Sequence, residues 1–422
     1  MDTKAYFKKA ERYYATTTVE TPIIVDRAED IYIFDAENNS YLDLTSGIGV
    51  ANIGYAQNDF IEAIFWHLIS RGYANILHHD WHNKITLDFA ERVVGKIENI
   101  FGDERKLIFT NSGTETTEAA IKLCFDQKKL KKPEEGIVVC FDGAFHGRSG
   151  YALPLMDPKK EVRIKHFPMA YKALRLPFPS AKVNLAKEIN SAFKNKKIDL
   201  KNIVAAIIEP IEGEGGINLP DNDQLKELEK FCRSNGIPLI ADEIQTGWGR
   251  TGKLLASEHF NLKPDIVLLG KGFGGGLPIG AAIFKKEMDF KEKGRHSSTF
   301  GGNALACAAA NATLDIIEKN NLIEKAEKMG LILEKKLKEL KKDFSPIIIE
   351  VRGKGLMWGV EFESPGIRNK IVEEGYRQGL VMMGCGLKTI RIMPPLIINE
   401  EQLNCALMRF KKAVSSVLAK EV

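Results

Sequence analysis

A lysine follows a short apolar run in the middle of the chain. Residues 266–269 (IVLL) predict a buried strand, and only Gly270 separates them from Lys271. Five more glycines stand between residues 272 and 280, where they allow close backbone approach to a ligand. A lysine at a strand end commonly lies in solvent. If this one is desolvated instead, its amine can form a Schiff base with a carbonyl compound.

An acid ends the apolar run that comes before this strand. Residues 238–242 read PLIAD, and Asp242 precedes Lys271 by about 30 residues, roughly one strand–helix–strand unit. A carboxylate at the end of a buried strand is costly unless a cation or hydrogen bonds hold it. Pyridoxal phosphate requires both groups, because a lysine carries its aldehyde and a carboxylate keeps its ring nitrogen protonated. Lys271 and Asp242 are therefore candidate catalytic residues.

Two long motifs surround these residues. The runs LIADEIQTGWGRTG (239–252) and PDIVLLGKGFGGGLPIGA (264–281) closely resemble the class III aminotransferases. This fold type I pyridoxal-phosphate family includes 4-aminobutyrate, ornithine and acetylornithine aminotransferases. Five motifs in the family's order, between about residues 43 and 395, extend the resemblance over nearly the whole chain. It implies an α/β fold, with a large domain built on a mostly parallel sheet covered by helices and a smaller α+β domain.

The order of expected elements agrees with this architecture. Strands and helices alternate in the middle of the chain, which favours a parallel sheet with helices on both faces. We expect residues 1–50 to be an N-terminal part of the small domain, 51–311 the large cofactor domain and 312–422 the C-terminal small domain. Residues 31–44 predict a β-hairpin, and residues 168–184 a loop crossing the surface.

The segment after residues 106–110 (KLIFT) could bind an anion. A strand, a small polar turn and a helix beginning near residue 116 would present backbone N–H groups and the helix dipole. Ser112 or Asn111 could equally be a plain helix N-cap. The resemblance favours phosphate binding and implies that Ser112, Gly113 and Thr114 hold the cofactor phosphate.

Further cofactor contacts are implied by the resemblance alone. Phe145, in the FHGR element, would stack on the pyridine ring, and Gln245 would hydrogen-bond the ring hydroxyl. His146 and Glu209 also match family positions, although a lone histidine is more often structural. Thr299 would reach the phosphate of the neighbouring subunit, which requires at least a homodimer and leaves a tetramer open. Otherwise Thr299 only precedes a helix.

The substrate contacts are implied in the same way. Arg391 matches the arginine that receives an α-carboxylate, and Arg148 the one that receives a second carboxylate. Glu214 would be a gate that pairs with Arg391 when no α-carboxylate is bound. This arrangement favours an ω-amino acid such as 4-aminobutyrate as donor and 2-oxoglutarate as acceptor.

Two other functions remain open from the residues. An amino-acid racemase of the same family would use the same lysine and ring, although such relatives tend to carry Asp where this chain has Glu214. A non-catalytic binding protein on this scaffold would have no chemical reason to keep both Lys271 and Asp242.

The composition excludes several broader classes. The 422 residues carry a net charge of +4, which does not suggest a nucleic-acid or membrane-surface partner. Six scattered cysteines form no CxxC pair, so we expect neither a bound metal nor a disulfide framework. No apolar run approaches about 18 residues and the N-terminus is charged, so we expect a cytoplasmic enzyme.

Overall fold

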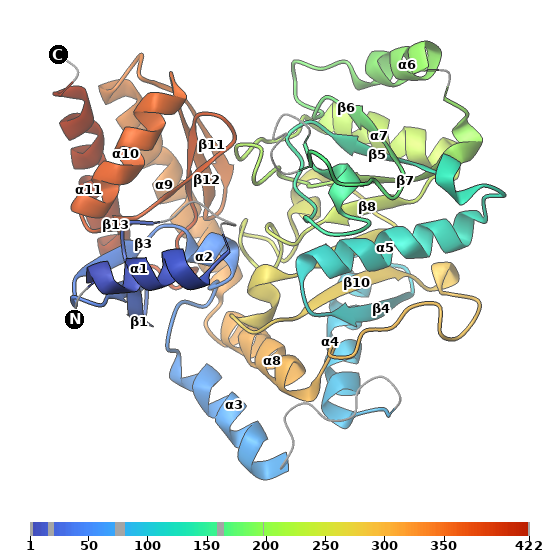
Figure 1. The fold of residues 1–422 in the computed structure, drawn as a ribbon, viewed down its shortest axis with the longest axis horizontal. Helices are drawn as coiled ribbons and strands as arrows, with labels where there is room; N and C mark the ends of the chain where they lie inside the picture. Colours follow the sequence, from blue (N-terminus) through green and yellow to red (C-terminus); the bar gives the residue numbers. More distant parts are fainter. Residues whose placement is uncertain (1–2, 16–20, 72–80, 158–163, 197, 421–422) are drawn as a thin grey trace.

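A seven-stranded sheet forms the centre of the larger lobe in the computed structural model (Figure 1), which describes residues 3–15, 21–71, 81–157, 164–196 and 198–420. Its strands lie in the order β4 (Arg105–Thr110), β10 (Gly280–Lys285), β9 (Ile266–Leu269), β8 (Leu239–Asp242), β7 (Ile203–Ile208), β5 (Ile137–Phe141) and β6 (Lys172–Leu176). Strand β10 pairs antiparallel with both β4 and β9, and the other pairings of this sheet are parallel. The expected mostly parallel sheet is confirmed.

Helices cover both faces of this sheet. One face packs against α5 (Gly113–Lys128), whose buried Ala120, Leu123 and Cys124 meet strand residues such as Val138. The opposite face packs against α6 (Leu185–Lys196) and α7 (Asn222–Ser234) near β7, and against α4 (Lys84–Phe101) and α8 (Ala304–Lys319) near β9. All six residues of β7 are buried, as expected for a strand covered on both faces.

Both ends of the chain build the second lobe. One sheet joins β1 (Val25–Glu29), β2 (Tyr32–Asp35) and β3 (Ser40–Asp43) to β13 (Leu380–Val381), which pairs parallel with β3. A second, antiparallel sheet contains β11 (Ile348–Lys354), β12 (Met357–Phe362), β15 (Thr389–Ile392) and β14 (Met383–Cys385). Figure 1 shows these strands beside α9 (Leu322–Asp343), α10 (Pro365–Arg377) and α11 (Glu400–Leu418).

The remaining elements connect the lobes or lie at their edges. They are α1 (Thr3–Tyr13), α3 (Asn58–Arg71) and α2 (Ser46–Gly49), a single turn with positive φ values. None of the helices within the described ranges is long and apolar enough to cross a membrane.

Three expectations from the sequence have different outcomes in the structure. The hairpin at residues 31–44 is confirmed by β2 and β3. The surface loop at residues 168–184 is wrong in part, because β6 lies within it and pairs parallel with β5 at the sheet edge. Lys172 and Arg175 interrupt any apolar run in this segment, and only Leu174 and Leu176 of the edge strand are buried. The boundary expected between residues 311 and 312 falls inside the continuous helix α8.

Candidate functional site

The candidate residues follow the carboxyl ends of neighbouring strands. Asp242 ends β8, Glu209 comes directly after β7, and Lys271 comes two residues after β9. The segment with Phe145 and His146 follows β5. Since ligands of open α/β sheets bind outside these strand ends, the topology itself brings the residues together.

A cavity of about 320 Å³ lies at this edge of the sheet. Ten residues singled out from the sequence line it: Gly113, Thr114, Phe145, His146, Arg148, Glu209, Glu214, Asp242, Gln245 and Lys271. Gly147 and Ile244 complete the lining. The motifs are far apart in the chain, yet they converge on one space of ligand size.

Lys271 has an unusual backbone and an altered acidity. Its φ is +46°, a left-handed value that is uncommon outside glycine. Burial lowers the pKa of Lys271 to about 8, and the charge of Arg391 adds to this lowering. The amine is therefore much more often neutral near pH 8 than an ordinary lysine.

Asp242 is fixed by two neighbours. Its Oδ2 lies 2.6 Å from Nδ1 of His146, and its Oδ1 accepts a hydrogen bond of 3.1 Å from the Ile244 backbone N–H. Both Asp242 and His146 are buried. Nε2 of His146 is buried with no hydrogen-bond partner in the described part of the chain. The histidine thus orients the carboxylate and offers a second ring nitrogen nearby.

Glu209 ties together two loops of the site. Its Oε1 accepts from the Phe145 backbone N–H and its Oε2 from the Gly213 backbone N–H, each at 2.9 Å. Burial raises the pKa of Glu209 above its ordinary value, and the nearby charge of Asp242 acts in the same direction. The geometry gives Glu209 a role in positioning the aromatic ring of Phe145.

The N-terminus of α5 forms one wall of the cavity. Gly113 has little room for a side chain, because a Cβ there would lie 3.0 Å from Cγ2 of Ile244. Ser112 caps the helix, with its Oγ accepting from the Glu115 backbone N–H at 3.4 Å. Of the two candidate N-cap residues, Ser112 and Asn111, Ser112 is the N-cap. Gly113 and Thr114 line the cavity. A helix N-terminus at this place favours an anion.

Arg391 lies just behind the lining and pairs with a residue of it. The arginine is almost fully buried, and its Nη2 forms a close ion pair with Oε2 of Glu214. Nη2 also donates to the Gly384 carbonyl at 3.3 Å. Nε and Nη1 of Arg391 are buried without a hydrogen-bond partner among the described residues. The guanidinium therefore keeps donors that a further anion could take.

Two other predicted residues differ in their placement. The guanidinium of Arg148 lies 5.7 Å from the ring centre of Phe145, on the cavity wall. Thr299 is exposed and does not line the cavity of its own chain. Ile244, which packs against Gly113, was not among the residues predicted for the site. Its position two residues after Asp242, as an apolar residue within a polar motif, was the available signal.

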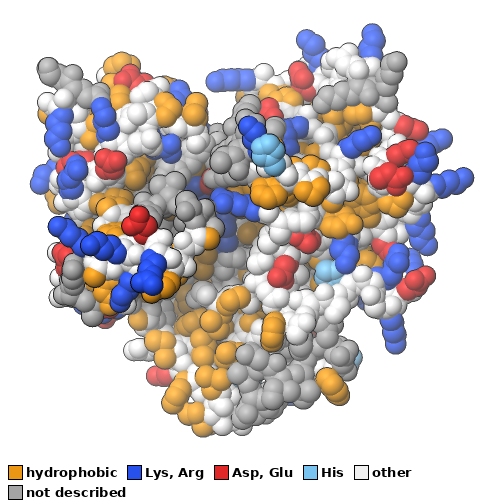
Figure 2. All heavy atoms as spheres, viewed as in Figure 1, with side chains coloured by type: hydrophobic (Ala, Val, Ile, Leu, Met, Phe, Trp, Pro, Cys, Tyr) orange, Lys and Arg blue, Asp and Glu red, His pale blue; other side chains and the backbone are white. Residues whose placement is uncertain are grey.

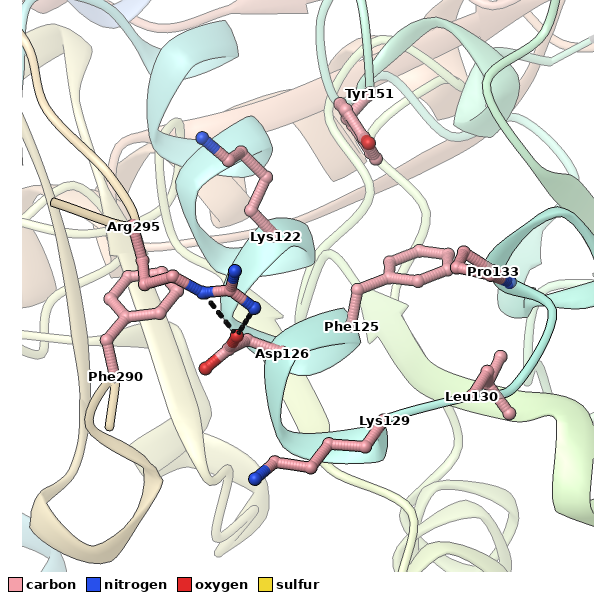
Figure 3. A pocket seen from close by; sticks show the side chains of 9 residues that line it. All are labelled: Lys122, Phe125, Asp126, Lys129, Leu130, Pro133, Tyr151, Phe290 and Arg295. Atoms are coloured by element: carbon pink, nitrogen blue, oxygen red, sulfur yellow. Dashed lines mark hydrogen bonds and ion pairs between the residues drawn. The ribbon is translucent and has the colours of Figure 1, made fainter. Parts of the chain in front are cut away.

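A second cavity, of about 340 Å³, lies at the far end of α5 (Figure 3). Figure 3 shows Arg295 directed at Asp126, and the two form an ion pair that offsets the positive charge of Arg295. Neither Lys271, nor Asp242, nor the N-terminus of α5 lines this second cavity, whereas all three line the first one.

The first cavity fits pyridoxal phosphate. Lys271 could hold the aldehyde, Asp242 lines the same space and could meet the ring nitrogen, and the N-terminus of α5 suits the phosphate. The flat ring of Phe145 lies on the wall. Oε1 of Gln245 is buried with no hydrogen-bond partner in the described ranges, as expected for a group that meets a ligand.

Comparisons with known proteins agree with this fit. The family model of class III aminotransferases matches residues 13–414. An acetylornithine aminotransferase of Aquifex aeolicus is 36% identical over 94% of this chain and 98% of its own length. An ornithine aminotransferase of Staphylococcus carnosus is 35% identical over 97% of this chain and 98% of its own length. The crystal structure of the Toxoplasma gondii ornithine aminotransferase superposes with a TM-score of 0.89 at 27% identity, covering 100% of this chain and 96% of that one. The chain belongs to the class III aminotransferases and is a pyridoxal-phosphate-dependent enzyme of fold type I.

Proposed function

We propose that this enzyme removes the terminal amino group of an ω-amino acid and passes it to an oxo acid such as 2-oxoglutarate. The observation that carries the proposal is the ion pair of Arg391 with Glu214 beside the cavity. With this pair closed, the buried cation is already neutralised. The site then suits a donor whose reacting end carries no carboxylate.

The second half of the reaction requires the pair to open. Glutamate and 2-oxoglutarate carry a carboxylate next to the reacting carbon, and Arg391 would receive it after Glu214 has moved away. An arginine fork binds a carboxylate through two parallel hydrogen bonds, and Nη1 of Arg391 is buried without a partner in the described part of the chain. Arg148, which lines the cavity, would take the carboxylate at the far end of either substrate.

The chemical work falls to Lys271 and Asp242. Pyridoxal phosphate supplies an aldehyde to which amines attach and a ring that accepts electrons. Lys271 would hold the cofactor, and its side-chain amine would take a proton from the substrate carbon that bears nitrogen. A pKa of about 8 suits this exchange, because it lies close to a working pH near neutrality. Asp242 would present its carboxylate to the ring nitrogen.

Ornithine and N-acetylornithine enter the proposal beside 4-aminobutyrate. All three carry a terminal amine, and the relatives described above are named for the first two. Those relatives are named as aminotransferases and give no support to the alternative of a racemase.

A second copy of the chain belongs to the proposal. Helix α3 exposes Ile61, Phe65 and Ile69 at four-residue spacing, together with Trp66, and Figure 2 shows apolar side chains gathered over this helix. Thr299 and its neighbour Phe300 are also exposed. Packing of two such faces would allow Thr299 to reach the phosphate in the partner's cavity.

The test is a panel of amines added singly to the cofactor-loaded protein without an oxo acid. Visible absorbance follows conversion to the amine form of the cofactor, and chromatography identifies the released product. We expect conversion by ornithine, N-acetylornithine or 4-aminobutyrate, and by glutamate. Replacing Arg148 with leucine should weaken the apparent affinity for the reacting donor. Conversion by glutamate alone, with none of the terminal amines reacting, would contradict the proposal.

A further inference from the structure

A second arginine lies beside the Arg391–Glu214 pair. Arg368 comes from α10, and its side chain packs directly on Gly384 of β14. A Cβ on Gly384 would lie 1.6 Å from Nη1 and 2.6 Å from Cζ of Arg368. Glycine is therefore required at position 384 if this guanidinium is to lie so close to the strand.

Gly384 is also where Arg391 is anchored. Strand β14 pairs with β15, so that Met383 lies opposite Arg391. The Gly384 carbonyl accepts the hydrogen bond from Nη2 of Arg391. Both guanidinium groups thus contact Gly384, which lies in β14 two residues before Gly386, a residue that hydrogen-bonds the Glu214 backbone. That contact runs from the Gly386 N–H to the Glu214 carbonyl oxygen, at 2.7 Å.

The contacts of Arg368 leave part of its hydrogen-bonding capacity unused. Nη2 donates to the Leu387 carbonyl at 3.2 Å, while Nε is buried without a hydrogen-bond partner among the described residues. Burial lowers the pKa of Arg368 below its ordinary value, while the charge of Glu214 acts to raise it and that of Arg391 to lower it. Glu214 therefore lies within electrostatic reach of both arginines.

We propose that Arg368 is the second partner of Glu214, which pairs with it when a substrate α-carboxylate occupies Arg391. The inference rests on the proposed function, since it names the residue that the Glu214 carboxylate contacts after it leaves Arg391. A carboxylate that leaves a buried arginine loses a favourable interaction unless another cation receives it. In this proposal the Gly386 N–H keeps its hydrogen bond to the Glu214 carbonyl, and the Glu214 side chain turns from Arg391 towards Arg368. Arg368 is thus a positioning residue for dual specificity.

The experiment compares two half-reactions in the cofactor-loaded enzyme: glutamate, and the terminal amine that converts the wild type. Arg368→Gln should weaken the apparent affinity for glutamate about tenfold, within the coupling range of interacting charged residues. The half-reaction with the terminal amine should stay within twofold of wild type, because the gate remains closed for it. Arg368→Lys should have an apparent affinity for glutamate much closer to that of wild type than Arg368→Gln has. Arg377→Gln, an exposed arginine on the same helix, should leave both half-reactions unchanged.

A double variant separates the gate from a general electrostatic effect. With Glu214→Gln there is no charge to relocate, so adding Arg368→Gln should change glutamate affinity less than twofold. Equal losses for both substrates in Arg368→Gln, or an undiminished loss in the double variant, would overturn the inference. Failure of the proposed function would be visible earlier, because no terminal amine would convert the wild type.

Discussion

Nδ1 of His146 lies 2.6 Å from Oδ2 of Asp242, with both side chains buried at the carboxyl end of β8. The contact joins two motifs that are 96 residues apart in the chain. It fixes the orientation of the carboxylate before any ligand binds, because a second hydrogen bond from the Ile244 N–H holds the other oxygen. Such preorganisation is how a charged group acts without having to reorient during a reaction.

Replacement of Asp242 with asparagine tests the need for its charge. The amide keeps the shape of the side chain but carries no negative charge for the ring nitrogen. We expect steady-state turnover to fall about 10²- to 10³-fold, the scale typical of one lost electrostatic contact. Cofactor absorbance should persist, because Lys271 is intact. Turnover within tenfold of wild type would show that the carboxylate has no such role.

The lowered pKa of Lys271 predicts how cofactor loading depends on pH. Only the neutral amine is a nucleophile, and its pKa in the cofactor-free protein is about 8. The loading rate, followed by absorbance after mixing with pyridoxal phosphate, should rise with pH and level off above about 8. A rate that keeps rising to about pH 10, as for an ordinary lysine, would argue against this environment.

The lowered pKa of Lys271 also makes the stability of the folded protein depend on pH. Between about pH 8 and 10.5 the unfolded chain would hold the Lys271 proton that the folded chain has lost. The contribution of Lys271 to the free energy of unfolding therefore increases with pH through this window. Lys271→Met should lack this increase when apo-protein unfolding is compared at the two ends of the window.

Buried Glu212 predicts an opposite pH dependence. Burial raises the pKa of Glu212 to about 8, and the charge of Glu209 adds to this effect. Between about pH 4.5 and 8 the folded state binds more protons, so stability falls as pH rises through that range. Glu212→Gln cannot ionise, and its unfolding temperature should gain on wild type by about 2 °C or more towards pH 8.

A matched control for this comparison is Glu227→Gln, which alters a half-exposed glutamate on α7. The difference in unfolding temperature between this variant and wild type should stay nearly constant with pH. If the difference between Glu212→Gln and wild type is equally constant, the carboxyl of Glu212 does not titrate as described.

The apolar face of α3 predicts the consequence of a charge placed there. Phe65→Glu should shift the protein towards monomers in analytical ultracentrifugation, because a buried unpaired carboxylate opposes association. Activity should fall with it if Thr299 serves the partner's site. Leu331→Glu, at a similarly exposed leucine on α9, should leave assembly unchanged. A Phe65→Glu protein that sediments like wild type would remove α3 from the interface.

Short sequence patterns were sufficient to predict many residues of the candidate site. The apolar runs ending at Asp242 and Lys271, and the polar turn before α5, give both the strands and the sheet edge where they meet. A sequence does not reveal contacts between distant segments. The Ser46 hydroxyl donates to the Met393 carbonyl across 347 residues, and β13 joins the N-terminal sheet by pairing with β3. Arg368 could not be predicted for the same reason, since only the packing of α10 on Gly384 of β14 places it beside Arg391.

The most direct test of the account is to locate the cofactor on the chain. Cofactor-loaded protein would be reduced with borohydride, digested and examined by mass spectrometry. We predict that the peptide containing Lys271 carries the added mass, and that Lys271→Ala protein carries none. Attachment at another lysine, or turnover retained in Lys271→Ala, would contradict the central role given to Lys271.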